Sequence, residues 1–121
     1  MTILRLKPIE IYEFRMTPEN LARHMEFDPQ NVLTGRSSQK GIVGDLFFIR
    51  GAGIYQLMSV KRYKDVAEYT SIQENVIREG FTNGKELFDI LAKVYGAHNK
   101  IVAHELHKMY GLEAEEIIEQ C

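Results

Sequence analysis

The chain has 121 residues, a length that suits one domain and leaves too little core for two self-sufficient ones. An apolar content of 45% and a net charge of only −2 exclude a mainly disordered chain. No stretch approaches the roughly 18 uncharged apolar residues of a membrane span, and Arg5 and Lys7 interrupt any secretory signal. The only cysteine is Cys121, which excludes an internal disulfide. We therefore expect a cytoplasmic protein with no membrane association.

Charge is unevenly distributed along the chain. Residues 1–70 carry ten Lys/Arg against eight Asp/Glu, whereas residues 71–121 carry five against nine. A protein that coats a nucleic-acid duplex is normally far more basic. The sequence therefore argues against such a protein and allows a local basic groove.

Turn and capping residues predict the elements of the first third. A short strand or extended arm is expected near the N-terminus, followed by a helix with Thr17 as N-cap and Pro18 as its first residue. Pro29 ends this helix. A second short helix is expected over residues 30–34, with Gly35 as its C-cap.

The middle of the chain is predicted to be β-structure. Residues 46–49 form a short apolar run, 51–53 a glycine turn, and 54–62 a longer strand with apolar residues on both faces. Such a strand suits a small barrel with helices outside it better than a one-sided sheet.

A capping box, Thr70 to Gln73, predicts a helix that buries Val76 and Ile77 and ends at Gly80. The hydroxyl of Thr70 is expected to accept the N–H of Gln73, and the side chain of Gln73 to reach back. This pattern fixes the predicted start of the helix at residue 70.

The last third is predicted to hold another helix, capped by Asn83 and ended by Gly96. Residues 100–110 are ambiguous, because their β-branched opening favours a strand while their apolar spacing also fits a helix. Residues 112–121 are expected to form a short acidic helical extension.

The histidines do not predict a metal site. His104 and His107 are three residues apart, whereas the metalloprotease helix needs a spacing of four, and no third ligand is evident. These residues, and the isolated His24 and His98, are expected to be surface side chains without partners. A nucleophile elbow and a Walker phosphate loop are also missing from the sequence.

The segment that follows Gly35 is the first candidate site. The segment from Arg36 to Lys40 brings together two cations, the hydroxyls of Ser37 and Ser38, and the amide of Gln39. The arginine fork, the hydroxyls and backbone N–H groups are the parts of an anion site. A solvated polar loop explains the segment equally well.

Glu79 is the second candidate. It is predicted to lie at the end of a helix, where a carboxylate is electrostatically unfavourable. Such a placement marks either a tolerated surface residue, which is the favoured interpretation, or a site residue.

Four short motifs follow one another in the chain. They are Val32-Leu-Thr-Gly-Arg-Ser-Ser38, Gly44-Asp45, Glu79-Gly80-Phe81 and Leu91-Ala-Lys-Val-Tyr-Gly96. Their order and spacing, over about residues 30–110, resemble the ASCH domain of the PUA-like superfamily. The resemblance implies an α+β fold with a small β-barrel flanked by helices, in which residues 100–110 form the closing strand. It also implies a cleft beside the barrel that binds RNA, often with modified nucleotides.

Some ASCH domains are enzymes, one of them an amidohydrolase of N4-acetylcytidine. The resemblance to this type implies a catalytic lysine just after Gly-Arg, a nearby threonine and the glutamate of Glu-Gly-Phe. In this chain Arg36 and Glu79 match the pattern, but Ser37 occupies the lysine position and Ser38 the next. Lys40, three residues further on, is the candidate substitute.

The leading hypothesis is a domain that binds single-stranded RNA or a nucleoside-like small molecule, with no metal and no cofactor. Arg36 and Lys40 would contact phosphate, and Glu79 would read a base edge or orient the loop, so these three residues are expected to line one cleft. An aromatic ring would stack on a base. The predicted binding residues are Arg36, Ser37, Ser38, Lys40, Glu79 and Tyr55, with Phe81 as an alternative to Tyr55 for stacking. A place in the hydrophobic core explains both aromatic residues at least as well.

Two other hypotheses stay open. The chain is a hydrolase of the N4-acetylcytidine amidohydrolase or ribonuclease type if Glu79 is a catalytic base beside the catalytic cation Lys40. It is a protein-interaction module if the acidic helix at 112–121 docks on a basic partner or on a second copy, forming a homodimer. A solvated helix explains this charge run better.

Overall fold

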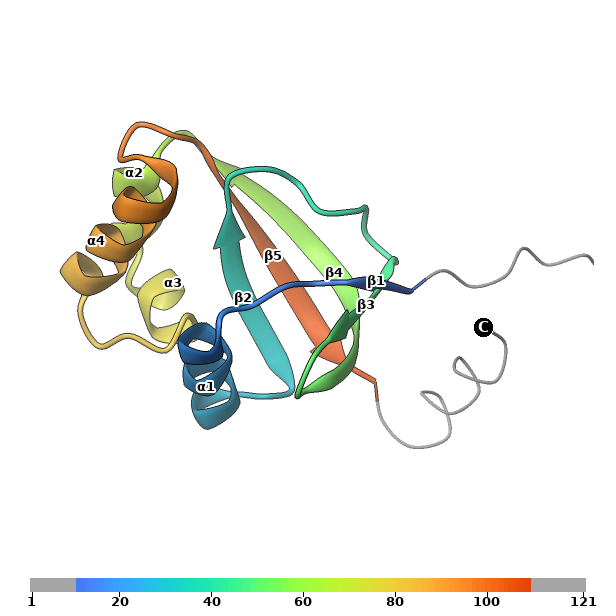
Figure 1. Ribbon diagram of the computed structural model, residues 1–121. Coiled ribbons are helices and arrows are strands. Elements are labelled where there is room, and N and C mark those ends of the chain that lie inside the picture. Colours follow the sequence, from blue (N-terminus) through green and yellow to red (C-terminus); the bar gives the residue numbers. More distant parts are fainter. Residues whose placement is uncertain (1–10, 110–121) are drawn as a thin grey trace, which may run out of the picture.

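One five-stranded sheet and four helices make up the structure, a computed structural model that describes residues 11–109 (Figure 1). The strands are β1 (Ile11–Glu13), β2 (Asn31–Arg36), β3 (Leu46–Ile49), β4 (Gly53–Tyr63) and β5 (Ile101–Lys108). The helices are α1 (Pro18–Phe27), α2 (Val66–Thr70), α3 (Gln73–Arg78) and α4 (Gly84–Tyr95). None of these helices is long and apolar enough to span a membrane. The predicted extension at 112–121 lies outside the described residues.

The strands lie in the order β1-β3-β4-β5-β2. β1 is parallel to β3, and the other neighbouring pairs are antiparallel. β1 and β2 are the two edges and do not pair with each other within the described part of the chain. The α+β class is therefore confirmed, whereas the sheet is not closed into the expected barrel.

β2 replaces the helix that was predicted at residues 30–34. β2 pairs with β5 along one edge. Val32, Leu33 and Thr34 are all buried. Leu33 belongs to the core cluster on one face of the sheet and Val32 to the cluster on the other. Gly35 continues the strand and is not a helix cap. A Cβ at Gly35 would lie 2.9 Å from Cγ2 of Ile101, so this glycine allows close packing.

The predicted capping box at Thr70 is also wrong. α2 begins earlier, where the Asp65 carboxylate accepts the N–H of Glu68 (2.8 Å), and Thr70 is its last residue. The Thr70 hydroxyl accordingly donates to the carbonyl of Val66 (2.9 Å). α3 then begins at Gln73 with no side-chain cap. Its inward residue Val76 is buried as predicted, but Ile77 is 42% exposed.

Other local signals are confirmed. Thr17 caps α1 by accepting the N–H of Asn20 (3.2 Å). Asn83 caps α4 in the same way, and Gly96 ends this helix with a positive φ of 95°. The glycine turn joins β3 to β4, and the ambiguous segment at 100–110 is a strand, β5, as the family resemblance implied.

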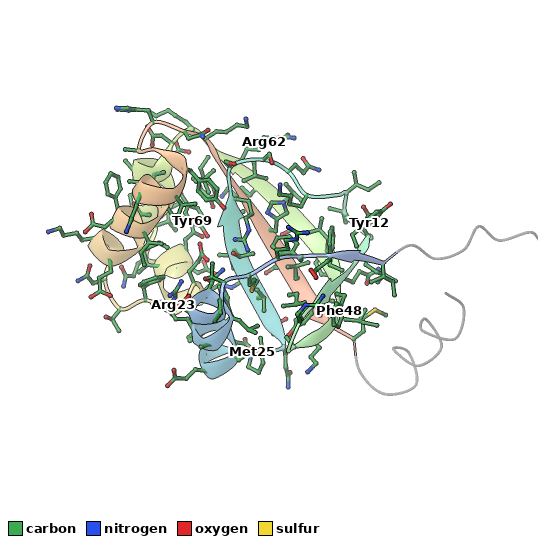
Figure 2. All side chains as sticks on the ribbon, in the orientation of Figure 1. Tyr12, Arg23, Met25, Phe48, Arg62 and Tyr69 are labelled. Atoms are coloured by element: carbon green, nitrogen blue, oxygen red, sulfur yellow. The ribbon has the colours of Figure 1, made fainter. Side chains whose placement is uncertain are left out.

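The sheet has a core cluster on each face. Tyr69, Leu87 and Ile101 belong to the cluster between the sheet and helices α2–α4. Phe14 and Tyr55 belong to the other cluster. In Figure 2, Tyr69 lies on the helical side, and Tyr12 and Phe48 lie at the far edge of the sheet. β2 and the segment after it run between these two regions.

Candidate functional site

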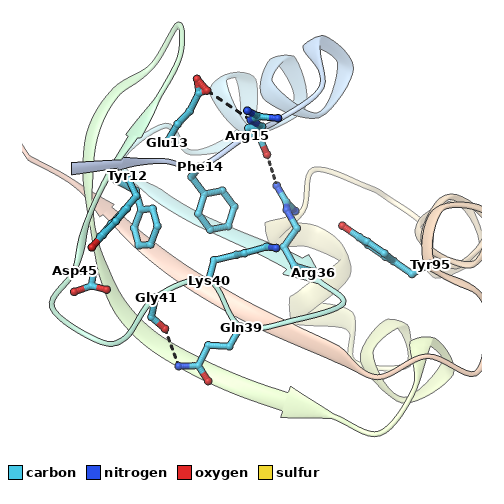
Figure 3. A pocket seen from close by; sticks show the side chains of 11 residues that line it. Tyr12, Glu13, Phe14, Arg15, Arg36, Gln39, Lys40, Gly41, Asp45 and Tyr95 are labelled. Carbon is cyan, nitrogen blue, oxygen red and sulfur yellow. Dashed lines mark hydrogen bonds and ion pairs between the residues drawn. The ribbon is translucent and has the colours of Figure 1, made fainter. Parts of the chain in front are cut away.

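A cavity of about 700 Å³, called here the main cavity, lies between the β1 segment and the residues after β2 (Figure 3). Arg36 and Lys40 both line it, as two of the predicted site residues were expected to do. Arg15, Tyr12 and Tyr95 also line it. Figure 3 shows the Lys40 side chain extending toward Arg36, with the ring of Phe14 beside both. The structure therefore brings the two cations of the basic segment together.

Arg36 is held in place by neutral groups. Its guanidinium donates to the carbonyls of Gly35 (2.9 Å) and Arg15 (3.1 Å) and to the hydroxyl of Thr34. The guanidinium also lies over the ring of Phe14, 4.9 Å from its centroid. Within residues 11–109 it forms no ion pair with a carboxylate. Its charge is therefore oriented but not neutralised.

Lys40 is held through its backbone. Its N–H donates to Nε2 of His104 (2.8 Å), while its side chain is exposed and forms no ion pair in the described part of the chain. His104 is fully buried on β5, so the expectation of a surface histidine was wrong for this residue. Burial, with a contribution from nearby Arg36, lowers the pKa of His104 to about 4. The ring is therefore neutral at pH 7 and can accept the bond.

Ser37 and Ser38 do not line the main cavity, contrary to prediction. Gln39 lines it instead, and its amide bridges Arg62 (2.6 Å) and the carbonyl of Gly41 (2.8 Å). The sequence placed Gln39 in the candidate segment but not among the predicted binding residues, because the direction of a loop side chain carries no sequence periodicity.

The core placement of Tyr55 and Phe81 is confirmed, and neither ring is exposed for stacking. Tyr55 is completely buried, and its hydroxyl donates to the carbonyl of Pro29 (2.6 Å). Phe81 is 8% exposed and lies under the guanidinium of Arg23 at 4.4 Å. The aromatic residue that is exposed at the main cavity is Tyr12, at 48%.

Glu79 is a buried residue and not the surface side chain that the sequence favoured. Its Oε2 accepts the hydroxyl of Tyr69 (2.8 Å) and the backbone N–H of Gly35 (3.2 Å). It lines a neighbouring cavity of about 160 Å³, called here the side cavity. Arg36 lines both cavities, but Lys40 lines only the main one. The single cleft expected for these three residues is therefore divided at Arg36.

His24, which the sequence placed on the surface, lies beside Glu79 and is 1% exposed. Its Nε2 is 3.5 Å from Oε1 of Glu79 and 2.8 Å from the carbonyl oxygen of Leu33. Its Nδ1 is 2.8 Å from the carbonyl oxygen of Asn20. A carbonyl oxygen only accepts, so both ring nitrogens must donate, and this is the protonated form.

The electrostatic surroundings agree with this assignment. Burial, the largest single influence, lowers the pKa of His24. The hydrogen bond and charge of Glu79, together with the bonds to the carbonyls of Asn20 and Leu33, outweigh it, and the pKa is raised above 6.5. The Glu79 charge also contributes, after burial, to a pKa of Tyr69 well above 10. Glu79 is therefore the counter-ion of a buried imidazolium.

Metal ligands do not gather in the described residues, where no three His, Cys, Asp or Glu side chains form a group that could hold an ion. His107 is on β5 with His104, and an odd separation on a strand directs the two rings to opposite faces. Comparisons of the chain with protein families, with curated proteins and with solved structures gave no match.

Proposed function

We propose that the chain binds a phosphate-bearing ligand, either a short single-stranded RNA or a nucleotide-like small molecule, in the main cavity. The observation that carries this proposal is that Arg36 and Lys40 point into one cavity, and neither is paired with an acid of the described residues. An arginine fork beside a lysine suits the bidentate and point-charge recognition of phosphate.

The rest of the cavity wall fits the same ligand. Two carboxylates line it, but Glu13 is paired with Arg50 (2.9 Å), and Asp45 accepts the N–H of Ile42 (3.0 Å). The exposed ring of Tyr12 offers a surface on which a base can stack. The volume of about 700 Å³ lies within the roughly 300–1,000 Å³ of small-molecule sites.

The resemblance to the ASCH domain supports an RNA-related ligand. In this proposal the sheet is a PUA-like barrel that stays open between β1 and β2. The hydrogen bond from Arg36 to the Arg15 carbonyl links the segments next to these two edge strands (3.1 Å). The site would therefore lie at the gap between the two edge strands. The net charge of −2 favours a short ligand over a long duplex.

A hydrolase is the second candidate, favoured by the buried carboxylate of Glu79 on a cavity that adjoins the main one at Arg36. Lys40 lines only the main cavity, so the catalytic pair Glu79 and Lys40 would have to act on a ligand that extends past Arg36. Turnover of N4-acetylcytidine by the wild-type chain and its loss in Glu79→Gln would support this candidate. Equal rates in both would exclude it.

Binding can be tested by calorimetric titration with a short single-stranded oligouridylate. Lys40→Ala removes an exposed charge and should weaken binding about tenfold, as expected for a hydrogen bond to a charged group. Lys85→Ala, an exposed lysine on α4 outside the main cavity, should bind as the wild type does. Equal affinity of Lys40→Ala and Lys85→Ala would contradict the proposal.

A further inference from the structure

His104 is a buried side chain that contacts two residues of the main-cavity wall, Lys40 and Phe14. Its Nε2 accepts the backbone N–H of Lys40 (2.8 Å). Its ring meets the ring of Phe14 edge-on, with centroids 5.4 Å apart. The guanidinium of Arg36 lies over the face of the Phe14 ring, 4.9 Å from the ring centroid. The imidazole of His104 therefore contacts both the backbone of Lys40 and the ring that packs against Arg36.

The bond to Lys40 fixes the state of the ring. A nitrogen that accepts an N–H carries no proton, so the proton of the neutral imidazole is on Nδ1. Full burial and the charges of Arg36 and Lys40 all disfavour a second proton, which agrees with a pKa of about 4 for His104. The cross-strand neighbours Thr34 and Val60 and the facing ring of Phe14 carry no charge.

We propose that His104 is a positioning residue of the main cavity, holding Lys40 by a hydrogen bond and Arg36 through Phe14, so that both cations meet one ligand. This inference rests on the proposed function. A protonated ring would lose its acceptor and would add a third positive charge behind the other two. The neutral ring is therefore the form that keeps the two cations in place.

The proposal has a reciprocal consequence. A bound anion offsets the charges of Arg36 and Lys40, which are two of the groups that disfavour protonation of the ring. Binding should therefore raise the pKa of His104, and by linkage protonation of His104 should weaken binding. A residue too far from Arg36 and Lys40 to feel their charge would show neither effect, whereas the loss of affinity in His104→Leu tests the positioning role itself.

The first experiment compares two variants for binding of the oligouridylate. His104→Leu removes the acceptor and should weaken binding by about three- to tenfold, the loss expected for one hydrogen bond. His104→Gln places an amide oxygen that can accept the Lys40 N–H, and it should restore much of the affinity. Thermal unfolding shows whether each variant is folded.

The second experiment needs no substitution at His104, and its main arm uses the wild-type chain. The His104 ring is titrated by NMR with and without the oligouridylate, and in a separate arm with inorganic phosphate. The pKa of His104 should rise with the oligouridylate, and Lys40→Ala should reduce this rise. A rise with inorganic phosphate as well would assign the effect to phosphate charge alone, which also supports the inference.

The two levels of the proposal fail differently. If the wild-type chain binds neither the oligouridylate nor inorganic phosphate, the proposed function is wrong, and the inference about His104 is wrong with it. If the wild type binds but a folded His104→Leu binds equally well, only the inference about His104 is wrong. A pKa of His104 that does not move in the bound wild-type chain would overturn the inference in the same way.

Discussion

His24 and Glu79 form a buried ion pair along the outer edge of β2, with Nε2 3.5 Å from Oε1. This edge would otherwise expose unpaired backbone groups. His24 donates to the carbonyl of Leu33, and Glu79 accepts the N–H of Gly35. The two side chains therefore act as the missing neighbour of the strand, and they anchor the residue that precedes Arg36. Covering an edge in this way also protects it from pairing with another chain.

Stability should depend on pH through His24. Its pKa in the folded chain is raised above 6.5, the ordinary value expected after unfolding. The stabilisation from this group is therefore complete below about pH 6.5 and is lost as the pH rises through the folded value. The free energy of unfolding, measured with urea, should fall as the pH rises above about 6.5. His24→Gln should flatten this dependence, whereas the same change at exposed His98 should leave it intact.

Removal of the counter-ion should be costly. Glu79→Ala leaves an unpaired imidazolium and the unpaired hydroxyl of Tyr69 in the interior. Loss of one partner of a buried ion pair typically costs about 3–5 kcal/mol. Glu74→Ala, an exposed change on α3, the helix that Glu79 follows, should stay within about 0.5 kcal/mol of wild type. Equal effects of the two changes in urea unfolding would show that Glu79 does not form the pair.

Gly35→Ala tests the close packing of β2 against its neighbours. The added Cβ would lie 2.9 Å from Cγ2 of Ile101 and 3.1 Å from the ring of Tyr69. Both neighbours are fully buried and have little room to move. Overpacking of this kind costs about 1–3 kcal/mol. A melting temperature equal to that of the wild type would contradict the register of β2 described above.

How far the sequence predicts this fold depends on which forces are local. Helix α4 was predicted at both ends, because Asn83 and Gly96 satisfy its backbone without help from the rest of the chain. β2 was missed, because Val32, Leu33 and Thr34 fit a short helix until β5, about 70 residues later, offers a partner. Strand pairing across such a distance is not encoded in nearby residues.

The candidate site also contains residues that nearby sequence predicts and residues whose role depends on distant parts of the chain. Arg36 and Lys40 were predicted from their place in one short segment, and the structure puts both on the main cavity. The burial of His24 and His104 was missed, because each ring has a partner that is distant in the sequence, the Leu33 carbonyl for His24 and the Lys40 N–H for His104. Tyr55 was misassigned, since nothing in its neighbourhood distinguishes a ring that faces the core from one that faces a ligand.

The stacking surface of the proposed site is tested by Tyr12→Ala. Tyr12 is 48% exposed at the main cavity, and loss of base stacking should weaken oligouridylate binding by about 1–3 kcal/mol. Phe27→Ala is the matched control, because Phe27 has the same exposure but lies on α1 and outside the main cavity. Equal loss of binding in both variants would show that Tyr12 has no specific role.

The salt dependence of oligouridylate binding tests the central claim most directly. Each cation that contacts phosphate should contribute about 0.7 to the slope of log affinity against log salt for a single strand. Lys40→Ala should therefore reduce the slope by about 0.7, and Lys85→Ala should leave it unchanged. A wild-type chain that does not bind, or a Lys40→Ala variant with the affinity and slope of the wild type, would contradict a phosphate site at Arg36 and Lys40.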